Sequence, residues 1–202
     1  MRRAAATGAL LIGLTGCGGG DGTGATGGAA GEGQPVALDA TGLTSALPLA
    51  HEIGDVYLDG ETVTVQASEA QEFCASKTNA PCPGITGGGL KETVVRGTDD
   101  EIEFLLFSFG TEDEAAAHLG KLVAERKKAA VDGYPVKPVT IDSGADETQA
   151  LQTEVGIDVY MRIGAVVSYV DANGVLLENA QRASKVQVDR IRTVAAGGTP
   201  GQ

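Results

Sequence analysis

The sequence lacks several features that would identify common classes of protein. Among its 202 residues, tryptophan is absent, histidine occurs twice and cysteine three times. Basic residues are scarce: 15 Lys and Arg face 27 Asp and Glu, and the net charge of −12 opposes binding to nucleic acid phosphates. The apolar run at residues 4–14 is shorter than the roughly 20 residues that cross a bilayer. We therefore expect neither a nucleic-acid-binding protein nor a membrane-spanning one.

Recognisable catalytic motifs are missing as well. The sequence contains no G-x-S-x-G turn and no H-E-x-x-H helix. Glycine-rich stretches occur at residues 22–27 and 84–91, but the first has no neighbouring strand and helix and the second has its lysine one place late for a phosphate-binding loop. We predict no catalytic residue, no cofactor and no metal site. A non-enzymatic protein is favoured, and an enzyme with an unrecognised active site is the alternative.

Residues 1–16 have the pattern of a bacterial export signal. Arg2 and Arg3 form a basic start, residues 4–14 are apolar, and Leu14-Thr15-Gly16-Cys17 follows. These four residues resemble the lipobox of bacterial lipoproteins, which implies cleavage before Cys17 and a diacylglyceryl group on its sulfur. Two acyl chains anchor a protein stably, so we expect it on the outer face of the cell membrane. The alternative is a secreted protein in which Cys17 is incidental.

The remaining chain divides into a tether, one domain and a tail. Residues 17–37 comprise the lipidated cysteine and a flexible tether rich in Gly, Ala and Thr, of which residues 18–36 are expected to span about 24 Å. Residues 38–195 are long enough for a single globular domain, and residues 196–202 are predicted to be a disordered tail. Without residues 1–16 the net charge becomes −14, so attachment to an anionic membrane must come from lipid.

Hydrophobic periodicity and turn signals predict the elements of this domain. A short or broken helix at 43–53 precedes a hairpin of strands 55–58 and 61–67 about Asp59-Gly60, and strands 90–96 and 101–109 form a second pair. A capping box at residues 111–114 opens a helix that ends at Gly133, strands 139–141 and 150–155 follow, and a helix closes the chain at 175–195.

The apolar stretch at 157–170 has two interpretations. Gly164 interrupts its alternation, so the stretch is either two strands joined by a tight turn or one strand with a bulge. In both cases strands outnumber helices and most connections are hairpins. The pattern predicts an α+β fold: an antiparallel sheet built largely of hairpins, with the two longer amphipathic helices mainly on one face.

Cys74 and Cys82 are predicted to form a disulfide. They are separated by seven residues in a chain that is expected to leave the reducing cytosol. Closing such a loop stabilises the folded state by about 2.6 kcal/mol in the chain-entropy model. Free thiols and a metal site are the alternatives. The metal site lacks further ligands, because the two histidines, His51 and His118, belong to different predicted helices.

The strand at 101–109 carries the strongest indication of a binding surface. One face has Ile102, Phe104 and Leu106, and the other has Leu105, Phe107 and Phe109. The second apolar face either packs against another element or lines a groove. We predict a binding surface on this face, with Tyr160 and Arg162 as the nearest polar residues. The acidic chain favours an apolar small molecule, a peptide or a neutral envelope component as ligand or protein partner.

The layout of the domain also resembles a known group. A capped helix follows an aromatic strand between Phe104 and Glu114, and the stretch from Tyr160 to Val167 contains R-x-G-x-V-V. These features resemble actinobacterial surface lipoproteins and are similar to the extracellular sensor domain of PknH-type serine/threonine kinases, over about residues 40–195. The resemblance implies an antiparallel sheet with helices, a disulfide-stabilised body and a cleft proposed for ligands. This chain departs from the group in having one cysteine pair in place of two and no kinase domain, so signalling is not carried over.

Overall fold

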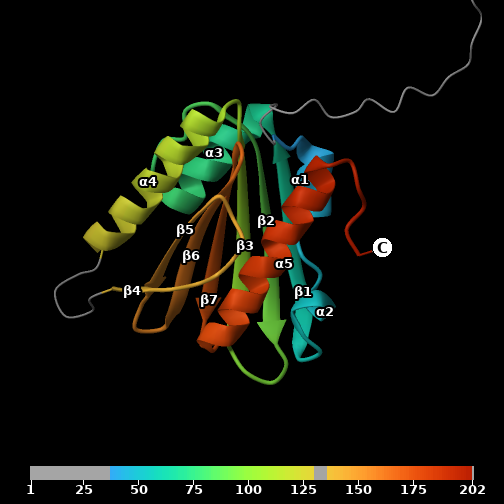
Figure 1. The fold of residues 1–202 in the computed structure, drawn as a ribbon, viewed down its shortest axis with the longest axis vertical. Coiled ribbons are helices and arrows are strands. Elements are labelled where there is room, and N and C mark those ends of the chain that lie inside the picture. The colour runs from blue at the N-terminus through green and yellow to red at the C-terminus, as the bar shows by residue number, and fades with distance from the viewer. Residues whose placement is uncertain (1–36, 130–135, 202) are drawn as a thin grey trace, which may run out of the picture. The chain divides into compact units, whose positions relative to one another are not determined.

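The computed structural model describes residues 37–129 and 136–201, in which a seven-stranded sheet is flanked by five helices (Figure 1). The helices are α1 (Ala40–Ala46), α2 (Ala50–Ile53), α3 (Ala67–Thr78), α4 (Glu112–Ala129) and α5 (Leu177–Ala195). The strands are β1 (Tyr57–Gln66), β2 (Ile85–Val95), β3 (Glu101–Phe109), β4 (Lys137–Val139), β5 (Glu147–Gln152), β6 (Gly156–Ile163) and β7 (Val166–Asn173).

All strand pairs in the sheet are antiparallel. The order is β1-β2-β3-β7-β6-β5-β4. Strands β1 to β3 form one half of the sheet and β4 to β7 form the other, and the pairing of β3 with β7 joins the two halves. The crossing from β3 to the other half of the sheet passes through α4 and β4. This arrangement confirms the predicted α+β fold with an antiparallel sheet.

Strand β3 contributes to a separate hydrophobic core on each side of the sheet. Ile102, Phe104 and Leu106 pack with residues of α1, α2 and α5. Leu105, Phe107 and Phe109 pack with residues of α4 and with the cysteines of the α3 region. Because successive side chains of a strand point to opposite faces, a strand such as β3, whose C-terminal half is apolar on both faces, requires cover on both.

The helices are therefore placed differently from the prediction. The two longer ones, α4 and α5, were expected mainly on one face, but α5 lies with α1 and α2 on one side, and α4 lies with α3 on the other. The α5 stripe of small and branched side chains, such as Ala180, Ala183 and Val188, fills the first core. The physical reason for the split is the apolar second face of β3, which needs a helix of its own.

Local signals near the middle of the chain are confirmed. The hydroxyl of Thr111 accepts a hydrogen bond from the Glu114 N–H at 3.2 Å, which is the cap expected at the start of α4. The Glu114 carboxylate accepts from the Thr111 hydroxyl at 3.0 Å, in place of the Thr111 backbone N–H of a full capping box. Strands β6 and β7 form a hairpin in which Gly164 has φ of 56°. Of the two interpretations of residues 157–170, two strands joined by a tight turn is therefore correct.

The first half of the domain differs from the prediction in two places. Asp59-Gly60 does not form a hairpin turn; β1 runs through it with an irregularity in its pairing between Asp59 and Thr62. Residues 67–78, for which no helix was predicted, form α3, which packs against β2. Strand β2 includes Gly87–Gly89 because helices press on both of its faces: a Cβ at Gly88 would lie 2.5 Å from the Phe73 ring of α3.

Several predictions fall outside the described residues. The signal peptide, Cys17 and nearly all of the tether belong to residues 1–36, and the predicted end of α4 at Gly133 lies in 130–135. Residues 196–201, predicted as a disordered tail, follow α5 as turns in which the Gly198 N–H donates to the Thr193 carbonyl. Among the helices of the described ranges, none has the length and hydropathy to cross a membrane.

The burial of Phe107 predicts a large effect on stability. Its side chain is fully buried in the second core. Phe107→Ala is expected to lower the free energy of unfolding by about 3–5 kcal/mol, because the mutation removes buried apolar area and leaves a cavity. Urea denaturation measures this change. Val155→Ala, at a position that is 64% exposed, is the control and should change stability by less than about 0.5 kcal/mol. A loss below about 1 kcal/mol for Phe107→Ala would contradict the assignment of this face as core.

Candidate functional site

A groove lies between α3 and α4 on the side of the second core. Its cavity has a volume of about 240 Å³ and is open to solvent. One wall is the C-terminal end of α3 with its cap, and the other is a single face of α4, while two tyrosines of the sheet form the floor. The lining residues are Lys77, Thr78, Asn79, Leu122, Glu125, Arg126, Ala129, Tyr160 and Tyr169.

The secondary structure explains why these side chains converge. Leu122, Glu125, Arg126 and Ala129 recur at spacings of three and four residues, which places them on one face of α4. Helix α3 ends at Asn79, whose φ of 53° and ψ of 30° are the left-handed cap conformation that asparagine tolerates. The groove therefore opens where α3 stops and α4 continues.

The floor is a pair of stacked tyrosine rings. Tyr160 of β6 and Tyr169 of β7 are direct partners in the β6–β7 hairpin, and their ring centroids are 4.6 Å apart with an interplanar angle of 6°. Burial raises the pKa of both hydroxyls, so both tyrosines are neutral at physiological pH. A flat aromatic floor with hydroxyl groups at its edge can contact an apolar ligand and also form hydrogen bonds to it.

A buried ion pair lies beside this floor. Asp158, two residues from Tyr160 on β6, is 1% exposed; it accepts a hydrogen bond from the Tyr169 hydroxyl at 3.0 Å and pairs with Nε of Arg126. The guanidinium of Arg126 thus joins α4 to the sheet and borders the groove. Removing one partner of such a pair would leave a charge buried without compensation, which is costly.

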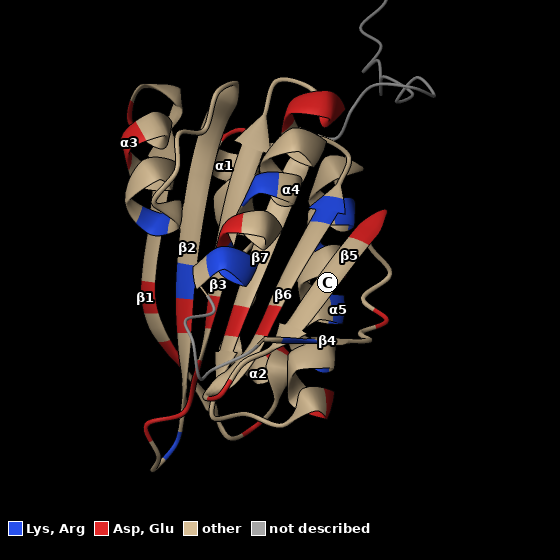
Figure 2. Ribbon diagram, turned by 90° about the vertical axis from the view of Figure 1, so that its left-hand side faces the viewer, with Lys and Arg blue, Asp and Glu red and all other residues tan. Residues whose placement is uncertain are grey.

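Carboxylates also form a row across four neighbouring strands. Glu92 pairs with Glu103, Glu103 with Asp171, and Asp171 with Asp158. Figure 2 shows acidic positions as a band across the sheet below α4. Lys77 contacts Glu103 of this row at 3.4 Å, and Arg126 pairs with Asp158. Both basic residues line the groove, so ion pairs connect the row to it.

The row perturbs the protonation of its members. Burial, and after it the negative charge of Asp158, raises the pKa of Asp171 to about 6. Burial likewise raises the pKa of Glu103, although Lys77 opposes the shift. Like charges on directly opposed strand positions destabilise a sheet, and here they gather next to the groove. The groove is therefore electrostatically better suited to an uncharged or cationic ligand than to an anionic one.

The predicted binding surface is wrong for its three apolar residues. Leu105, Phe107 and Phe109 do lie on the same face of the sheet as Tyr160, but they are at most 1% exposed and belong to the core under α3 and α4. The reason is that α3, which the sequence did not predict, joins α4 in covering this face. No surface is left at these positions.

The two polar residues of the predicted surface have different locations. Tyr160 lines the groove. Arg162 lies further along β6, where its guanidinium is within 4.0 Å of carboxylates of Glu112, Asp146 and Glu147 and donates to the Gly164 carbonyl at 3.2 Å. The structure thus keeps Tyr160 at the candidate site and separates Arg162 from it.

Several groove residues were missed by the sequence analysis. Tyr169, and Asp171 beside the groove, could have been paired with Tyr160 and Asp158, because the two members of each pair are equally far from the two-residue turn Gly164-Ala165. Lys77 had no such signal, since α3 itself was not predicted. Arg126 was not singled out by the sequence analysis either, and it reaches the buried Asp158 from α4.

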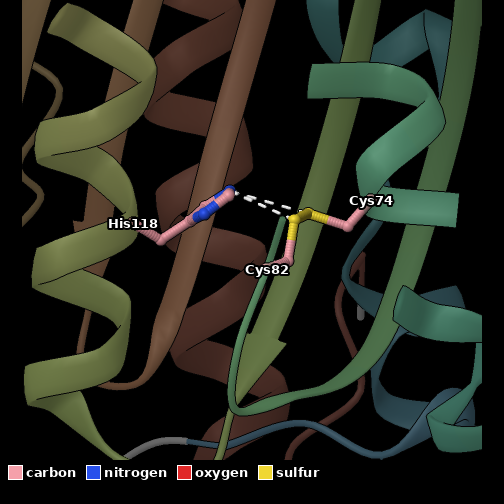
Figure 3. Close-up of side chains that lie close together, drawn as sticks. All are labelled: Cys74, Cys82 and His118. Carbon is pink, nitrogen blue, oxygen red and sulfur yellow. Dashed lines mark hydrogen bonds between the residues drawn. A yellow bond between two sulfur atoms is a disulfide. The ribbon is translucent and has the colours of Figure 1, made fainter. Parts of the chain in front are cut away.

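The cysteines and one histidine form a second cluster, beneath α3 and α4. Cys74 and Cys82 are joined by a disulfide, in agreement with the prediction. His118 of α4 approaches the disulfide, with Nε2 3.6 Å from Cys74 Sγ and 4.0 Å from Cys82 Sγ (Figure 3). Burial lowers the pKa of His118 to about 4, and the charge of Lys121 adds to the effect. The imidazole is therefore neutral at physiological pH.

The lowered pKa of His118 makes stability depend on pH. The unfolded chain takes up this proton near pH 6.5, whereas the folded protein takes it up near pH 4, so stability falls as the pH drops from 6.5 to 4. This contribution amounts to about 3 kcal/mol. The raised pKa of Asp171 acts in the opposite direction, because the folded state then binds the proton more tightly.

Comparison of variants isolates the histidine. His118→Leu should remove this loss between pH 6.5 and 4, as measured by urea denaturation at a series of pH values. His51→Ala, at an exposed position of α2, is the matched control and should keep the wild-type profile. Parallel profiles for the wild type and His118→Leu would contradict the assignment.

Comparison with known proteins identifies a similar fold. The sequence matches no protein-family profile and has no significant match among curated proteins. Among solved structures, the extracellular domain of PknH from Mycobacterium tuberculosis superposes with a TM-score of 0.55 at 15% sequence identity. The match covers 79% of this chain and 98% of that domain. The chain therefore shares the fold of the extracellular domain of PknH.

Proposed function

We propose that the protein is a lipid-anchored lipoprotein on the outer face of the cell membrane, and that its domain binds a small ligand in the groove between α3 and α4 without catalysing a reaction. The observation that carries the binding function is the open cavity of about 240 Å³ with a floor of stacked Tyr160 and Tyr169. An apolar floor surrounded by a few polar groups is the usual composition of a small-molecule site.

Three features support an extracytoplasmic location. The lipobox-like Leu14-Thr15-Gly16-Cys17 follows a basic and apolar start, which is the pattern of an exported lipoprotein. The disulfide of Cys74 and Cys82 suits an oxidising compartment. The fold is also that of a domain described as extracellular.

The polar groups of the groove support binding over catalysis. Arg126 and Asp158 are paired with each other, and the Tyr169 hydroxyl donates to Asp158. The Thr78 hydroxyl donates to the Cys74 carbonyl at 2.8 Å. A hydroxyl nucleophile requires a base within hydrogen-bond reach, and this hydroxyl is instead directed to the backbone.

Blocking the groove tests the binding function. Fragments that bind the wild-type protein are first found by ligand-observed NMR with a library of uncharged and cationic organic compounds. Ala129→Trp places a bulky ring in the groove from α4 and is expected to weaken these fragments by at least about tenfold, because the cavity is filled. Ala124→Trp places the same ring on an exposed part of α4 outside the groove and should leave binding unchanged.

The chain has no natural tryptophan, so fluorescence of the introduced ring reports directly on its surroundings. Equal fragment binding by both variants would show that the groove is not the site. A library without any binder to the wild type would count against a small-molecule ligand.

Replacement of Cys17 tests the membrane anchor. Cys17→Ala removes the sulfur that would carry the diacylglyceryl group, so the protein should move from the membrane fraction to the medium or accumulate as an unprocessed precursor. Fractionation followed by intact-mass spectrometry distinguishes these products. Thr23→Ala, which keeps Cys17, is the control and should leave the fractionation unchanged. Membrane retention of processed Cys17→Ala protein would contradict lipid anchoring.

A further inference from the structure

The disulfide and His118 place three possible metal ligands together in the interior. The two sulfurs and a ring nitrogen of His118 lie within 4.8 Å of one another, and all three residues are at most 2% exposed. They come from α3, the loop before β2, and α4, which the fold brings together between the helices and the sheet (Figure 3).

The ring of His118 packs in the core, but its nitrogen atoms lack ordinary hydrogen-bond partners. Its ring lies between Phe107 and Phe109, with centroid distances of 5.6 and 5.1 Å. Nδ1 has no hydrogen-bond partner in the described residues, and Nε2 contacts only the two sulfurs, which are weak acceptors. A buried polar side chain with such weak partners calls for an explanation other than hydrogen bonding.

The distances from the imidazole to the sulfurs fit a tetrahedral zinc site. With Zn–S near 2.3 Å and Zn–N near 2.05 Å, a sulfur and a nitrogen bound to the same tetrahedral zinc are about 3.6 Å apart, and two bound sulfurs are about 3.8 Å apart. The observed distance of 3.6 Å from Nε2 to Cys74 Sγ equals the first value, and the distance of 4.0 Å to Cys82 Sγ is slightly longer. The bond between the two sulfurs must break before they can reach the second value.

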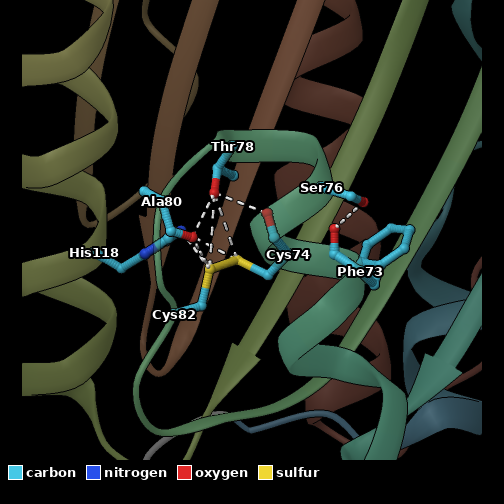
Figure 4. Close-up of a disulfide and its surroundings, with 7 residues drawn as sticks. All are labelled: Phe73, Cys74, Ser76, Thr78, Ala80, Cys82 and His118. Atoms are coloured by element: carbon cyan, nitrogen blue, oxygen red, sulfur yellow. Dashed lines mark hydrogen bonds between the residues drawn. A yellow bond between two sulfur atoms is a disulfide. The ribbon is translucent and has the colours of Figure 1, made fainter.

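A fourth ligand can reach this position from the groove. The Thr78 hydroxyl lies 3.9 Å from Cys74 Sγ and 3.8 Å from Cys82 Sγ (Figure 4), and Thr78 also lines the groove. Either this hydroxyl or a water molecule from the groove would complete the coordination. Two thiolates, one neutral imidazole and Zn²⁺ have no net charge, which suits a buried site.

We propose that reduction of the Cys74–Cys82 disulfide converts this cluster into a zinc site with Cys74, Cys82 and His118 as ligands. A dithiol reductant supplies two electrons and two protons: the sulfur–sulfur bond of the protein breaks, two thiols form, and the reductant becomes a disulfide. Zn²⁺ then replaces the two thiol protons, which are released to solvent. The metal site and the disulfide are alternative states of the same residues, and neither depends on the groove binding a ligand.

Cobalt binding by the reduced protein tests this proposal. All proteins carry Cys17→Ser, so that Cys74 and Cys82 are the only thiols. A water-soluble trialkylphosphine reduces the disulfide without adding a competing thiol ligand, and Co²⁺ then serves as a coloured substitute for Zn²⁺. We expect one Co²⁺ per chain, thiolate-to-cobalt charge-transfer absorption, d–d bands of tetrahedral intensity, and loss of these bands when Zn²⁺ is added.

The controls separate this site from adventitious binding. The unreduced protein should bind no Co²⁺. His118→Gln should weaken binding by more than about tenfold, since loss even of an outer-shell partner weakens metal binding by 10–100-fold. His51→Gln is the matched control for the second histidine and should bind as the parent does.

Three results would overturn the proposal. The first is a reduced protein that binds no Co²⁺, and the second is a spectrum and affinity unchanged by His118→Gln. The third is loss of the folded circular dichroism spectrum on reduction that Zn²⁺ does not restore, because the site exists only where the fold holds α3 against α4.

Discussion

Strand β3 imposes the constraint on which the rest of the structure depends. It lies in the middle of the sheet and is apolar on both faces, so each face must be covered for the strand to leave water. Helices α1, α2 and α5 cover one face, and α3 and α4 cover the other. The need to cover both faces of β3 accounts for the two cores and for the presence of helices on both sides of the sheet.

The candidate site exists because α3 and α4 do not cover the whole of the second face of the sheet. Near β3, Phe107 and Phe109 are sealed beneath α4 and the disulfide region. Further across the sheet, beyond the end of α3, the floor changes from phenylalanine to the stacked Tyr160 and Tyr169, and the groove opens. The candidate site and the second core thus share one layer, in which core residues hold the helices that form the groove.

Polar residues in this layer are arranged so that their burial is compensated. Arg126 neutralises Asp158, and Lys77 neutralises Glu103, so the two helices that form the groove are also tied to the sheet by charge. His118 is the exception, since only the disulfide sulfurs contact its Nε2. The layer therefore combines an accessible aromatic site with a closed sulfur and imidazole cluster, connected through Thr78.

The sequence by itself determined the features that depend on interactions between residues close together in the chain. Thr111 and Glu114 fix the start of α4, Gly164 permits the turn of the β6–β7 hairpin, and the alternation on β6 places Asp158 and Tyr160 on one face. The antiparallel α+β class also follows from such signals, since hairpins and capped helices are short-range structures.

Only the tertiary structure decided which helix covers which face and which distant side chains meet. Asp59-Gly60 continues as strand because β2 pairs on either side of it, and Gly87–Gly89 belong to a strand because α1 and α3 press on it. His118 reaches the disulfide across 36 residues of sequence, and Arg126 reaches Asp158 across 32. Such contacts depend on how whole helices pack on the sheet. The hydrophobic effect that drives this packing is non-directional, so the apolar pattern of a helix does not show which face of the sheet it will cover.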